Sequence, residues 1–503
     1  MHLYLQGHDF HFELENVSRL FLPLEKIVTH SDGSSVEEVD GLRVIATMAR
    51  EGQGARLTCR VTVDGFDEQR SSVVSDTGEG FRDVCELELC TLLYHLLAQL
   101  LGFTQTWGLV TGVRPVKLLR RLTREMGAQR AEDYLREKLL VSEGKLALCR
   151  NTLAIEDEIL SLSRPESFSL YISIPFCPTR CDYCSFVSQT VVQAKKLIPV
   201  YVDQLCREIA YTGEIARRLG LRLETVYFGG GTPTTLSAEQ LTRLLRAVEE
   251  NFDLSTVREY TVEAGRPDTV TADKLAAIRA AGVGRVSINP QTLQPAVLAG
   301  IGRRHTVEQF YDAFDLARKA GFENINTDLI AGLPDDTFEG FHNTLDGILR
   351  LSPESVTVHT LSMKRASNIM LQHRPDYRVQ DDAVRMVGLS AEALPQAGYR
   401  PYYLYRQSRT VGNQENVGWA KPGCEGLYNV YIMDETHTIL ACGAGGVSKL
   451  KKPNSDYLER IFNYKFPYEY NTGLDEMLAR KDAVPTFYEK HGFGDCKSLQ
   501  NPL

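Results

Sequence analysis

The chain has 503 residues, of which 43% are hydrophobic, so it is long enough for about three domains that each bury a core. Its formal net charge of −9 offers no general attraction for nucleic acid, and its N-terminus lacks the basic and apolar regions of an export signal. Eleven cysteines, an odd number, are typical of a reduced cytoplasmic protein rather than a disulfide-stapled secreted one. The most membrane-like segment, residues 91–103, is too short to span a bilayer and is interpreted as a core helix.

Residues 1–165 are predicted to form an α+β N-terminal domain. The alternation of Phe10, Phe12 and Leu14 indicates a strand, and the odd-numbered residues of 57–63 repeat this pattern. Helices are expected over 83–101 and 131–162. The Arg164-Pro165 pair ends the second helix and marks the domain boundary.

From Phe168 onward, apolar β-rich runs alternate with amphipathic helices, which predicts parallel βα units over residues 166–375. Six strands are expected, over 170–176, 225–228, 259–263, 285–289, 324–330 and 355–361. The helices expected between them cover 200–218, 238–251, 272–281, 307–320 and 338–351. Six units are too few for a closed eight-fold barrel.

Residues 376–503 are predicted to form a smaller, separate C-terminal lobe. A helix is expected over 381–397, and strands are expected over 399–404, 428–434 and 438–441. Such a lobe would cover the mouth of the barrel and keep water and dioxygen out.

Three cysteines follow the first predicted barrel strand, in the stretch LYISIPFCPTRCDYCSF. Cys177, Cys181 and Cys184 have the spacing C-x3-C-x2-C, and thiolates this close on one loop can converge on a soft metal centre. A structural zinc site would need a fourth ligand, and none follows within the loop. Three ligands for a four-iron cluster leave one iron open, which suits a cluster that binds and reduces a substrate. We therefore expect the three cysteines to be both metal ligands and catalytic residues.

Polar residues follow the next strands, where a parallel barrel gathers its reactive groups. The second strand runs into Gly229-Gly230-Gly231-Thr232-Pro233, whose missing side chains let backbone groups approach a ligand closely. Glu263 ends the third strand, and Asp328 lies on the fifth. Between them, Gln291 and Arg303 follow the fourth strand. Carboxylates suit the hydroxyl and amino groups of a ligand, and an arginine suits its carboxylate.

These motifs resemble those of the radical S-adenosylmethionine (SAM) enzymes. Within them, Tyr171-x-x-Ile174-Pro175-Phe176-Cys177 and Tyr183-Cys184 are similar to the oxygen-independent coproporphyrinogen III oxidase (dehydrogenase) family, in the branch with an extra N-terminal domain. The resemblance covers about residues 169–450. It implies an α/β fold, namely an open partial (β/α)6 barrel of the radical SAM type with an α+β N-terminal domain and a smaller C-terminal lobe.

The resemblance also implies the cofactors, which are a [4Fe-4S] cluster on the three cysteines and S-adenosyl-L-methionine. The glycine run around Gly230 would hold the amino group of SAM. Tyr171, Tyr183 and Glu263 would line this SAM molecule. The residues implied to line a second SAM molecule are Gly231, Thr232, Gln291, Arg303 and Asp328.

By the same resemblance, the reaction is the oxygen-independent oxidative decarboxylation of coproporphyrinogen III to protoporphyrinogen IX in haem biosynthesis, by a 5′-deoxyadenosyl radical. The implied partners are the porphyrinogen substrate and a cellular electron donor such as flavodoxin or ferredoxin. Four cationic residues are candidates for binding the substrate carboxylates: Arg303, Arg304, Lys364 and Arg365.

One departure from the oxidases keeps a second function open, and one departure from the chaperones argues against that function. The characterised oxidases continue as C-x3-C-x2-C-x-C, whereas this chain has Ser185-Phe186 and shares the lack of a fourth cysteine with the family's haem-transfer chaperones. Those chaperones carry H-N-x-x-Y-W in the C-terminal lobe, where this chain reads Tyr428-Asn429-Val430-Tyr431-Ile432. The oxidase ranks first and a haem-binding chaperone second. A zinc-stabilised scaffold ranks third because the loop lacks a fourth ligand.

Overall fold

The computed structural model describes residues 1–34, 41–186, 188–362 and 377–492. The chain divides into two compact units, Met1–Ala147 and Leu148–Leu503. This division falls earlier than the boundary expected near residue 165, because helix α5 (Glu143–Leu160) runs across it and lies mostly in the second unit. The division into three domains stays a prediction.

The first unit combines a five-stranded sheet with helices, as predicted for an α+β domain. Its strand order is β2-β1-β3-β4-β5, in which β1 is parallel to β2 and β3 and the other pairs are antiparallel. The strands are β1 (His2–Gln6), β2 (Val28–His30), β3 (Arg43–Glu51), β4 (Gly54–Val63) and β5 (Phe66–Ser75). The helices are α1 (His11–Phe21), α2 (Phe81–Leu101), α3 (Pro115–Met126) and α4 (Ala128–Asp133), followed by a π-helical turn, η1 (Tyr134–Lys138).

One strand expected in this unit is wrong. Phe10 is the N-cap residue of helix α1, which contains Phe12 and Leu14; Phe10 and Leu14 are buried, whereas Phe12 is 63% exposed. Leu14, Val17 and Phe21 recur at helical spacing and are buried, so the period of the core-facing residues is that of a helix. The second strand pattern is confirmed in β4.

Among the described residues, one helix, α2, is long and apolar enough to cross a membrane. It is longer than the apolar segment 91–103 because it begins at Phe81. Its buried side chains belong to the core of the first unit, together with those of α1, β1, β3 and β4. The prediction of a core helix is therefore confirmed.

The second unit is built on an eleven-stranded sheet of order β14-β15-β13-β12-β11-β10-β9-β6-β16-β17-β18. All six predicted barrel strands are present and run parallel to one another. They are β6 (Ser167–Ile174), β9 (Arg222–Gly230), β10 (Glu259–Glu263), β11 (Arg285–Ser287), β12 (Asn324–Ala331) and β13 (Ser355–Thr360). Within the described part of the chain, β14 and β18 end the sheet at opposite edges, so the barrel is open as expected.

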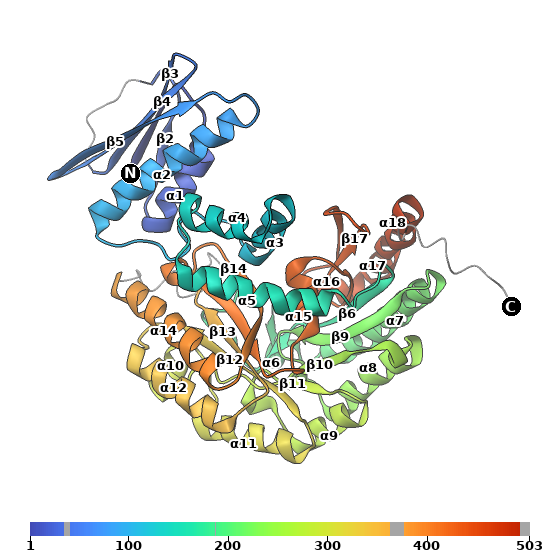
Figure 1. The fold of residues 1–503 in the computed structure, drawn as a ribbon. Helices are drawn as coiled ribbons and strands as arrows, with labels where there is room; N and C mark the ends of the chain where they lie inside the picture. Colours follow the sequence, from blue (N-terminus) through green and yellow to red (C-terminus); the bar gives the residue numbers. More distant parts are fainter. Residues whose placement is uncertain (35–40, 187, 363–376, 493–503) are drawn as a thin grey trace. The chain divides into compact units, whose positions relative to one another are not determined.

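Helices connect the parallel strands and cover the outside of the sheet (Figure 1). They are α7 (Ile198–Arg218), α8 (Ala238–Asn251), α9 (Ala272–Ala280), α10 (Pro295–Gly300), α11 (Val307–Lys319) and α12 (Phe338–Leu351). Capping boxes start α8 at Ser237 and α11 at Thr306, where the side chains satisfy backbone amides that lack helical partners. Because helices cover the outer face and polar side chains fill the inner face, strands such as β9 are buried at nearly every position.

The strands after residue 376 continue the barrel sheet at both of its edges. Strands β14 (Arg400–Arg406) and β15 (Glu415–Ala420) extend it antiparallel beyond β13, and β16 (Thr438–Cys442) pairs parallel with β6. The expected strand over 428–434 is wrong: these residues form helix α15 (Leu427–Asp434), since Tyr428 and Tyr431 are buried at helical spacing. The remaining elements are α14 (Tyr377–Gln396), β17 (Val447–Lys451), β18 (Leu458–Phe462), α16 (Pro467–Thr472), α17 (Leu474–Lys481) and α18 (Ala483–His491).

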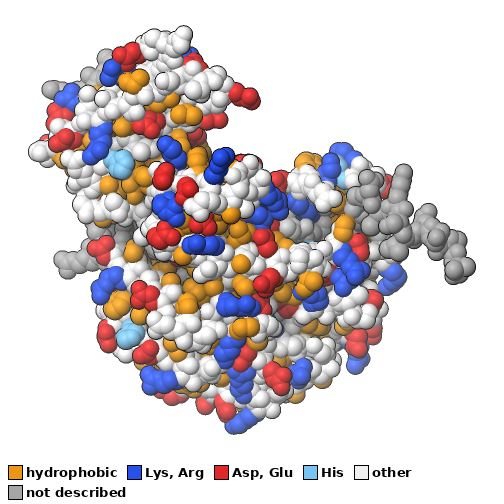
Figure 2. Space-filling view, viewed as in Figure 1, with side chains coloured by type: hydrophobic (Ala, Val, Ile, Leu, Met, Phe, Trp, Pro, Cys, Tyr) orange, Lys and Arg blue, Asp and Glu red, His pale blue; other side chains and the backbone are white. Residues whose placement is uncertain are grey.

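Two short strands organise the loop after β6, namely β7 (Phe176–Cys177) and β8 (Gln189–Thr190), which pair in parallel and lead into the short helix α6 (Val191–Ala194). On the face of the second unit seen in Figure 2, Lys and Arg side chains are interspersed with Asp and Glu, so that face shows no continuous basic patch.

Candidate functional site

The loop that carries the three cysteines is held by neighbouring backbone. Cys177 lies on β7, and the amide of Asp182 donates a 3.1 Å hydrogen bond to the Ile301 carbonyl. The Cys184 amide donates to the Cys181 carbonyl, so the last two cysteines share one turn. Cys181 is buried, whereas Cys177 and Cys184 are half-buried. Burial raises the pKa of the Cys177 thiol and raises that of Cys184 to about 11, and the other thiols contribute to both shifts.

The glycine run lies directly against the cysteine loop. The Thr232 amide donates a 2.8 Å hydrogen bond to the Phe176 carbonyl, and the Thr232 hydroxyl is 3.5 Å from the Cys177 sulfur. A Cβ atom on Gly231 would lie 2.6 Å from the Phe176 carbonyl oxygen and 3.0 Å from that sulfur. Gly230 has a φ of +106°, which side chains of L-residues rarely adopt. The glycines are therefore needed for the close approach of the two loops.

Three tyrosine rings form a stack next to Glu263. The ring centroid of Tyr171 lies 6.3 Å from that of Tyr227 and 5.9 Å from that of Tyr428, and the latter two are 4.4 Å apart. The Tyr227 hydroxyl donates a 2.6 Å hydrogen bond to the Glu263 carboxylate. Burial raises the pKa of Glu263 to about 7, although this hydrogen bond acts in the opposite direction. Tyr171 and Glu263, both expected in the site, thus belong to one cluster.

Asp328 lies in a second polar cluster, on β12. Its two oxygens accept hydrogen bonds from the side-chain amides of Asn289 at 2.8 Å and Asn326 at 2.7 Å, and His359 Nε2 is 3.7 Å away. Burial alone would raise the pKa of Asp328, but His359 and Asn326 hold it below its ordinary value. The Gln291 amide donates to the backbone carbonyl of Asp328 at 3.0 Å, with Gln291 at a φ of +69°.

The buried side chain of Arg303 connects this cluster with the cysteine loop. Its Nε donates to the Tyr183 hydroxyl at 3.2 Å, and its Nη1 donates to the Asn289 carbonyl at 2.6 Å. Asn289 in turn binds Asp328. The structure therefore brings together the predicted residues Tyr183, Arg303 and Asp328, which are far apart in the sequence.

Four further residues in contact with this site were missed by the sequence analysis: Tyr227, Arg266, Asn289 and His359. Tyr227 lies on the predicted second strand, and the register seen in the structure pairs it with Tyr171 on the first. No motif marks Arg266, whose contact with the cysteine loop depends on the fold.

The three thiols lie on one loop, where Cys181 is buried and Cys177 and Cys184 are half-buried. Among the described residues, no three His, Cys, Asp or Glu side chains converge closely enough to hold one metal ion. Iron–sulfur clusters are held by cysteine thiolates, and this loop supplies three cysteines. Gly231 lets the glycine run approach the Cys177 sulfur, because an added Cβ would lie only 3.0 Å from it. The residues present therefore fit a [4Fe-4S] cluster.

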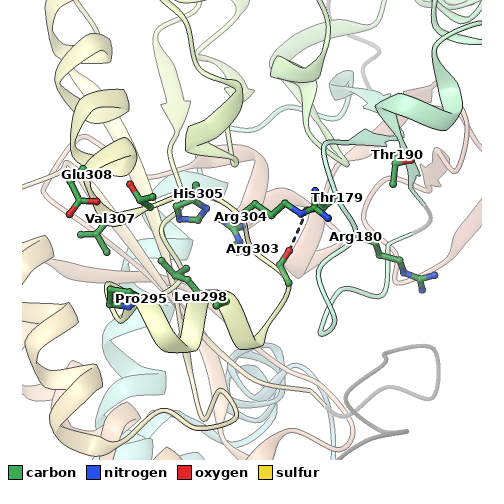
Figure 3. Close-up of a pocket in the computed structure, with 13 residues that line it drawn as sticks. Thr179, Arg180, Thr190, Pro295, Leu298, Arg303, Arg304, His305, Val307 and Glu308 are labelled. Atoms are coloured by element: carbon green, nitrogen blue, oxygen red, sulfur yellow. Dashed lines mark hydrogen bonds between the residues drawn. The ribbon is translucent and has the colours of Figure 1, made fainter.

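A cavity of about 810 Å³ opens beside the cysteine loop, a size typical of ligand pockets (Figure 3). Thr179 and Arg180 of the loop line one side, and Arg304 belongs to the opposite segment, 295–308. The Thr179 hydroxyl donates a 3.3 Å hydrogen bond to the Gly302 carbonyl and so joins the two sides of the cavity. Burial lowers the pKa of His305 to about 3, so the positive charge of the lining comes from arginines.

Comparisons with known proteins agree with this geometry. A family model described as the Radical SAM superfamily matches residues 171–348. The oxygen-independent coproporphyrinogen-III oxidase-like protein HemZ of Bacillus subtilis is 35% identical over 495 residues, which cover 96% of this chain and 97% of that protein. The heme chaperone HemW of Lactococcus lactis is 34% identical over 289 residues, which cover 57% of this chain and 70% of that protein.

Among solved structures, coproporphyrinogen III oxidase (HemN) from Escherichia coli, described as a Radical SAM enzyme, matches with a TM-score of 0.50 and 24% identity. The match covers 64% of this chain and 72% of that one, and at this identity it shows the fold alone, which confirms the predicted barrel. The radical SAM superfamily uses a [4Fe-4S] cluster and SAM, so the predicted cofactors are confirmed as well. Because the likeness to HemZ extends over nearly all of both chains, this protein belongs to the oxygen-independent coproporphyrinogen III oxidase-like family of radical SAM proteins.

Proposed function

We propose that this protein catalyses the oxygen-independent oxidative decarboxylation of coproporphyrinogen III to protoporphyrinogen IX. The observation that carries the proposal is the arrangement of the cysteine loop, the glycine run and the polar strand ends at one mouth of the barrel. Family membership supports it. The proposal includes a cytoplasmic location and a one-electron donor protein such as flavodoxin or ferredoxin.

In this proposal the site residues take the roles that the family resemblance implies. Cys177, Cys181 and Cys184 hold the cluster. The residues that bind SAM are Tyr171, Tyr183, Gly230, Gly231, Thr232, Glu263, Gln291, Arg303 and Asp328. When bound, the cluster and SAM supply one-electron chemistry that removes a hydrogen atom from the substrate. The chain's own groups hold the reactants: the ionised Asp328 accepts hydrogen bonds, and Glu263 does so increasingly above a pH of about 7.

A substrate with four carboxylates needs cationic partners. Arg304 is exposed and lines the cavity beside the cysteine loop. Arg303 is buried, and its guanidinium already donates to the carbonyls of Asn289 and Gly265. Arg304 is therefore the better candidate of the two for a substrate carboxylate. The candidates Lys364 and Arg365 lie outside the described residues.

Haem binding is the second candidate function, because HemW relatives are named as heme chaperones and this chain has Ser185-Phe186 in place of a fourth cysteine. The tyrosines of α15, however, are committed to the protein interior. Tyr428 belongs to the tyrosine stack. The ring centroid of Tyr431 lies 3.6 Å from that of His437, and the Tyr431 hydroxyl donates a 2.9 Å hydrogen bond to the Glu224 carboxylate. Either ring could reach a haem iron only if α15 moved. This observation favours the decarboxylase.

The deciding experiment is anaerobic incubation of reconstituted protein with SAM, a reductant and coproporphyrinogen III, followed by mass analysis of the product. We expect the loss of two carbon dioxide units per molecule. Cys181→Ala is the matched control, which should hold no intact cluster and form no product while its circular dichroism stays native. Stoichiometric haem binding without decarboxylation would overturn the proposal in favour of the chaperone.

A further inference from the structure

Arg266 is a buried cation that touches the cysteine loop. It follows β10 by three residues, and 3% of its surface is exposed. Its Nη1 lies 3.6 Å from the Cys181 sulfur and donates to the Thr179 hydroxyl at 3.2 Å, so it contacts two residues of the loop. On its other side, Nε and Nη2 donate to the two oxygens of Asp268 at 3.1 and 3.2 Å.

These contacts give the guanidinium a fixed direction. Asp268, whose side chain is 20% exposed, holds one edge of the planar group, and the Cys181 sulfur meets the other edge. The pair is therefore a dipole with its positive end at the sulfur. A guanidinium stays protonated in proteins, so its charge persists in these buried surroundings. Asp268 offsets part of the cost of burying that charge.

Hydrogen bonds to the sulfurs and nearby charge set the reduction potentials of iron–sulfur centres. One-electron reduction adds a negative charge to the cluster and its thiolates, and a cation close to a ligand sulfur stabilises that charge. We propose that Arg266 raises the reduction potential of the cluster held by the three cysteines, and that Asp268 limits this effect. Arg266 acts through Cys181 and is a positioning residue. The inference rests on the cluster assignment within the proposed function and does not depend on the identity of the substrate.

The test is the midpoint potential of the reconstituted protein, measured by anaerobic redox titration with electron paramagnetic resonance. Arg266→Gln should lower the equilibrium constant for one-electron reduction at least tenfold, which is about 59 mV for a one-electron couple. Arg266→Lys keeps a charge and should retain most of the potential. Asp268→Asn should shift the potential upward, because the guanidinium charge is then no longer offset. Arg243→Gln on α8, which breaks an exposed ion pair with Asp203 on α7, is the control and should leave the potential unchanged.

Iron content and the melting temperature of the apo-protein separate tuning from a purely structural role. Unchanged potentials in Arg266→Gln and Asp268→Asn at full iron content would overturn the proposal. If Arg266→Gln holds no cluster, Asp268→Asn decides alone, and the absence of an upward shift overturns it. Shifted potentials without any decarboxylation of coproporphyrinogen III would refute the proposed function and leave this inference standing.

Discussion

The Tyr227 hydroxyl donates a 2.6 Å hydrogen bond to the carboxylate of Glu263, across the neighbouring parallel strands β9 and β10. The carboxyl group is buried, and its pKa is raised to about 7 even with this hydrogen bond. Its charge therefore changes near neutral pH. A ligand bound beside Glu263 meets an acceptor above that pH and a hydrogen-bond donor below it.

The free energy of unfolding of the apo-protein should depend on pH because of this carboxyl group. The folded pKa of about 7 lies above the ordinary value of 4.5, so between these pH values the folded state holds more protons than the unfolded state. The contribution of Glu263 to the free energy of unfolding therefore falls as pH rises from 4.5 to 7, by at most about 1.4 kcal/mol per pH unit.

Glu263→Gln removes this dependence. In urea unfolding from pH 5 to 8, the stability of the variant relative to the wild type should increase up to about pH 7 and then level off. Glu392→Gln, at an exposed position of α14, is the matched control and should show no such increase. A constant difference between Glu263→Gln and the wild type across this range would contradict the assigned pKa.

Tyr227→Phe keeps the stacked ring and removes only the hydroxyl that binds Glu263. A hydrogen bond to an ionised group contributes about 1.5–3 kcal/mol, so the variant should be destabilised by about that amount at pH 8 and by less at pH 5. The same urea titrations measure both values. Equal destabilisation at the two pH values would show that the hydroxyl does not distinguish the ionised carboxylate.

The barrel strands were predictable because a parallel strand that is buried on both faces has a short run of apolar residues, such as Val226, Tyr227 and Phe228 in β9. The segments around Phe10 and Tyr428 were wrongly predicted to be strands. Both are short, and their aromatic residues fit either a strand or a helical period. Tertiary packing decides: Tyr428 meets Tyr227, and Tyr431 meets His437, only when the segment is the helix α15.

The residues of the candidate site likewise divide into those that could be predicted from the sequence and those that only the fold brings together. Its cysteines, glycines and strand-end carboxylates could be found because they fall within motifs or directly after predicted strands. His359 and Arg266 could not, because their importance depends on contacts between distant segments. The register that pairs Thr357 with Asp328 brings His359 to the carboxylate, and no sequence spacing relates Arg266 to Cys181.

Gly231→Ala should damage the cysteine loop. The added Cβ would lie 2.6 Å from the Phe176 carbonyl oxygen and 3.0 Å from the Cys177 sulfur, and the backbone cannot yield without moving the loop. We expect a loss of about 1–3 kcal/mol of apo-protein stability and a marked drop in iron content after reconstitution. Gly388→Ala on α14 has open space around the new methyl group and should be neutral or slightly stabilising. Full iron loading of Gly231→Ala would contradict this role.

Glu224→Gln should destabilise the second unit more than any change named above, because Glu224 is fully buried and joins the start of β16 to the barrel. Its carboxylate accepts hydrogen bonds from Ser167 at 2.6 Å and Tyr431 at 2.9 Å, and His437 lies 3.8 Å away. Two arginines, Arg222 and Arg258, complete its partners.

Removing one partner of such a buried charge network costs about 3–5 kcal/mol, because the arginines then lack their counter-charge. Urea unfolding at pH 7 measures this loss, with Glu392→Gln again as the exposed control. Burial also lowers the pKa of His437 to about 4, so the wild type should lose stability as pH falls from 6.5 to 4, where only the unfolded state takes up the proton. A loss below about 1 kcal/mol in Glu224→Gln would mean that water replaces the carboxylate and that the network does not hold β16 in place.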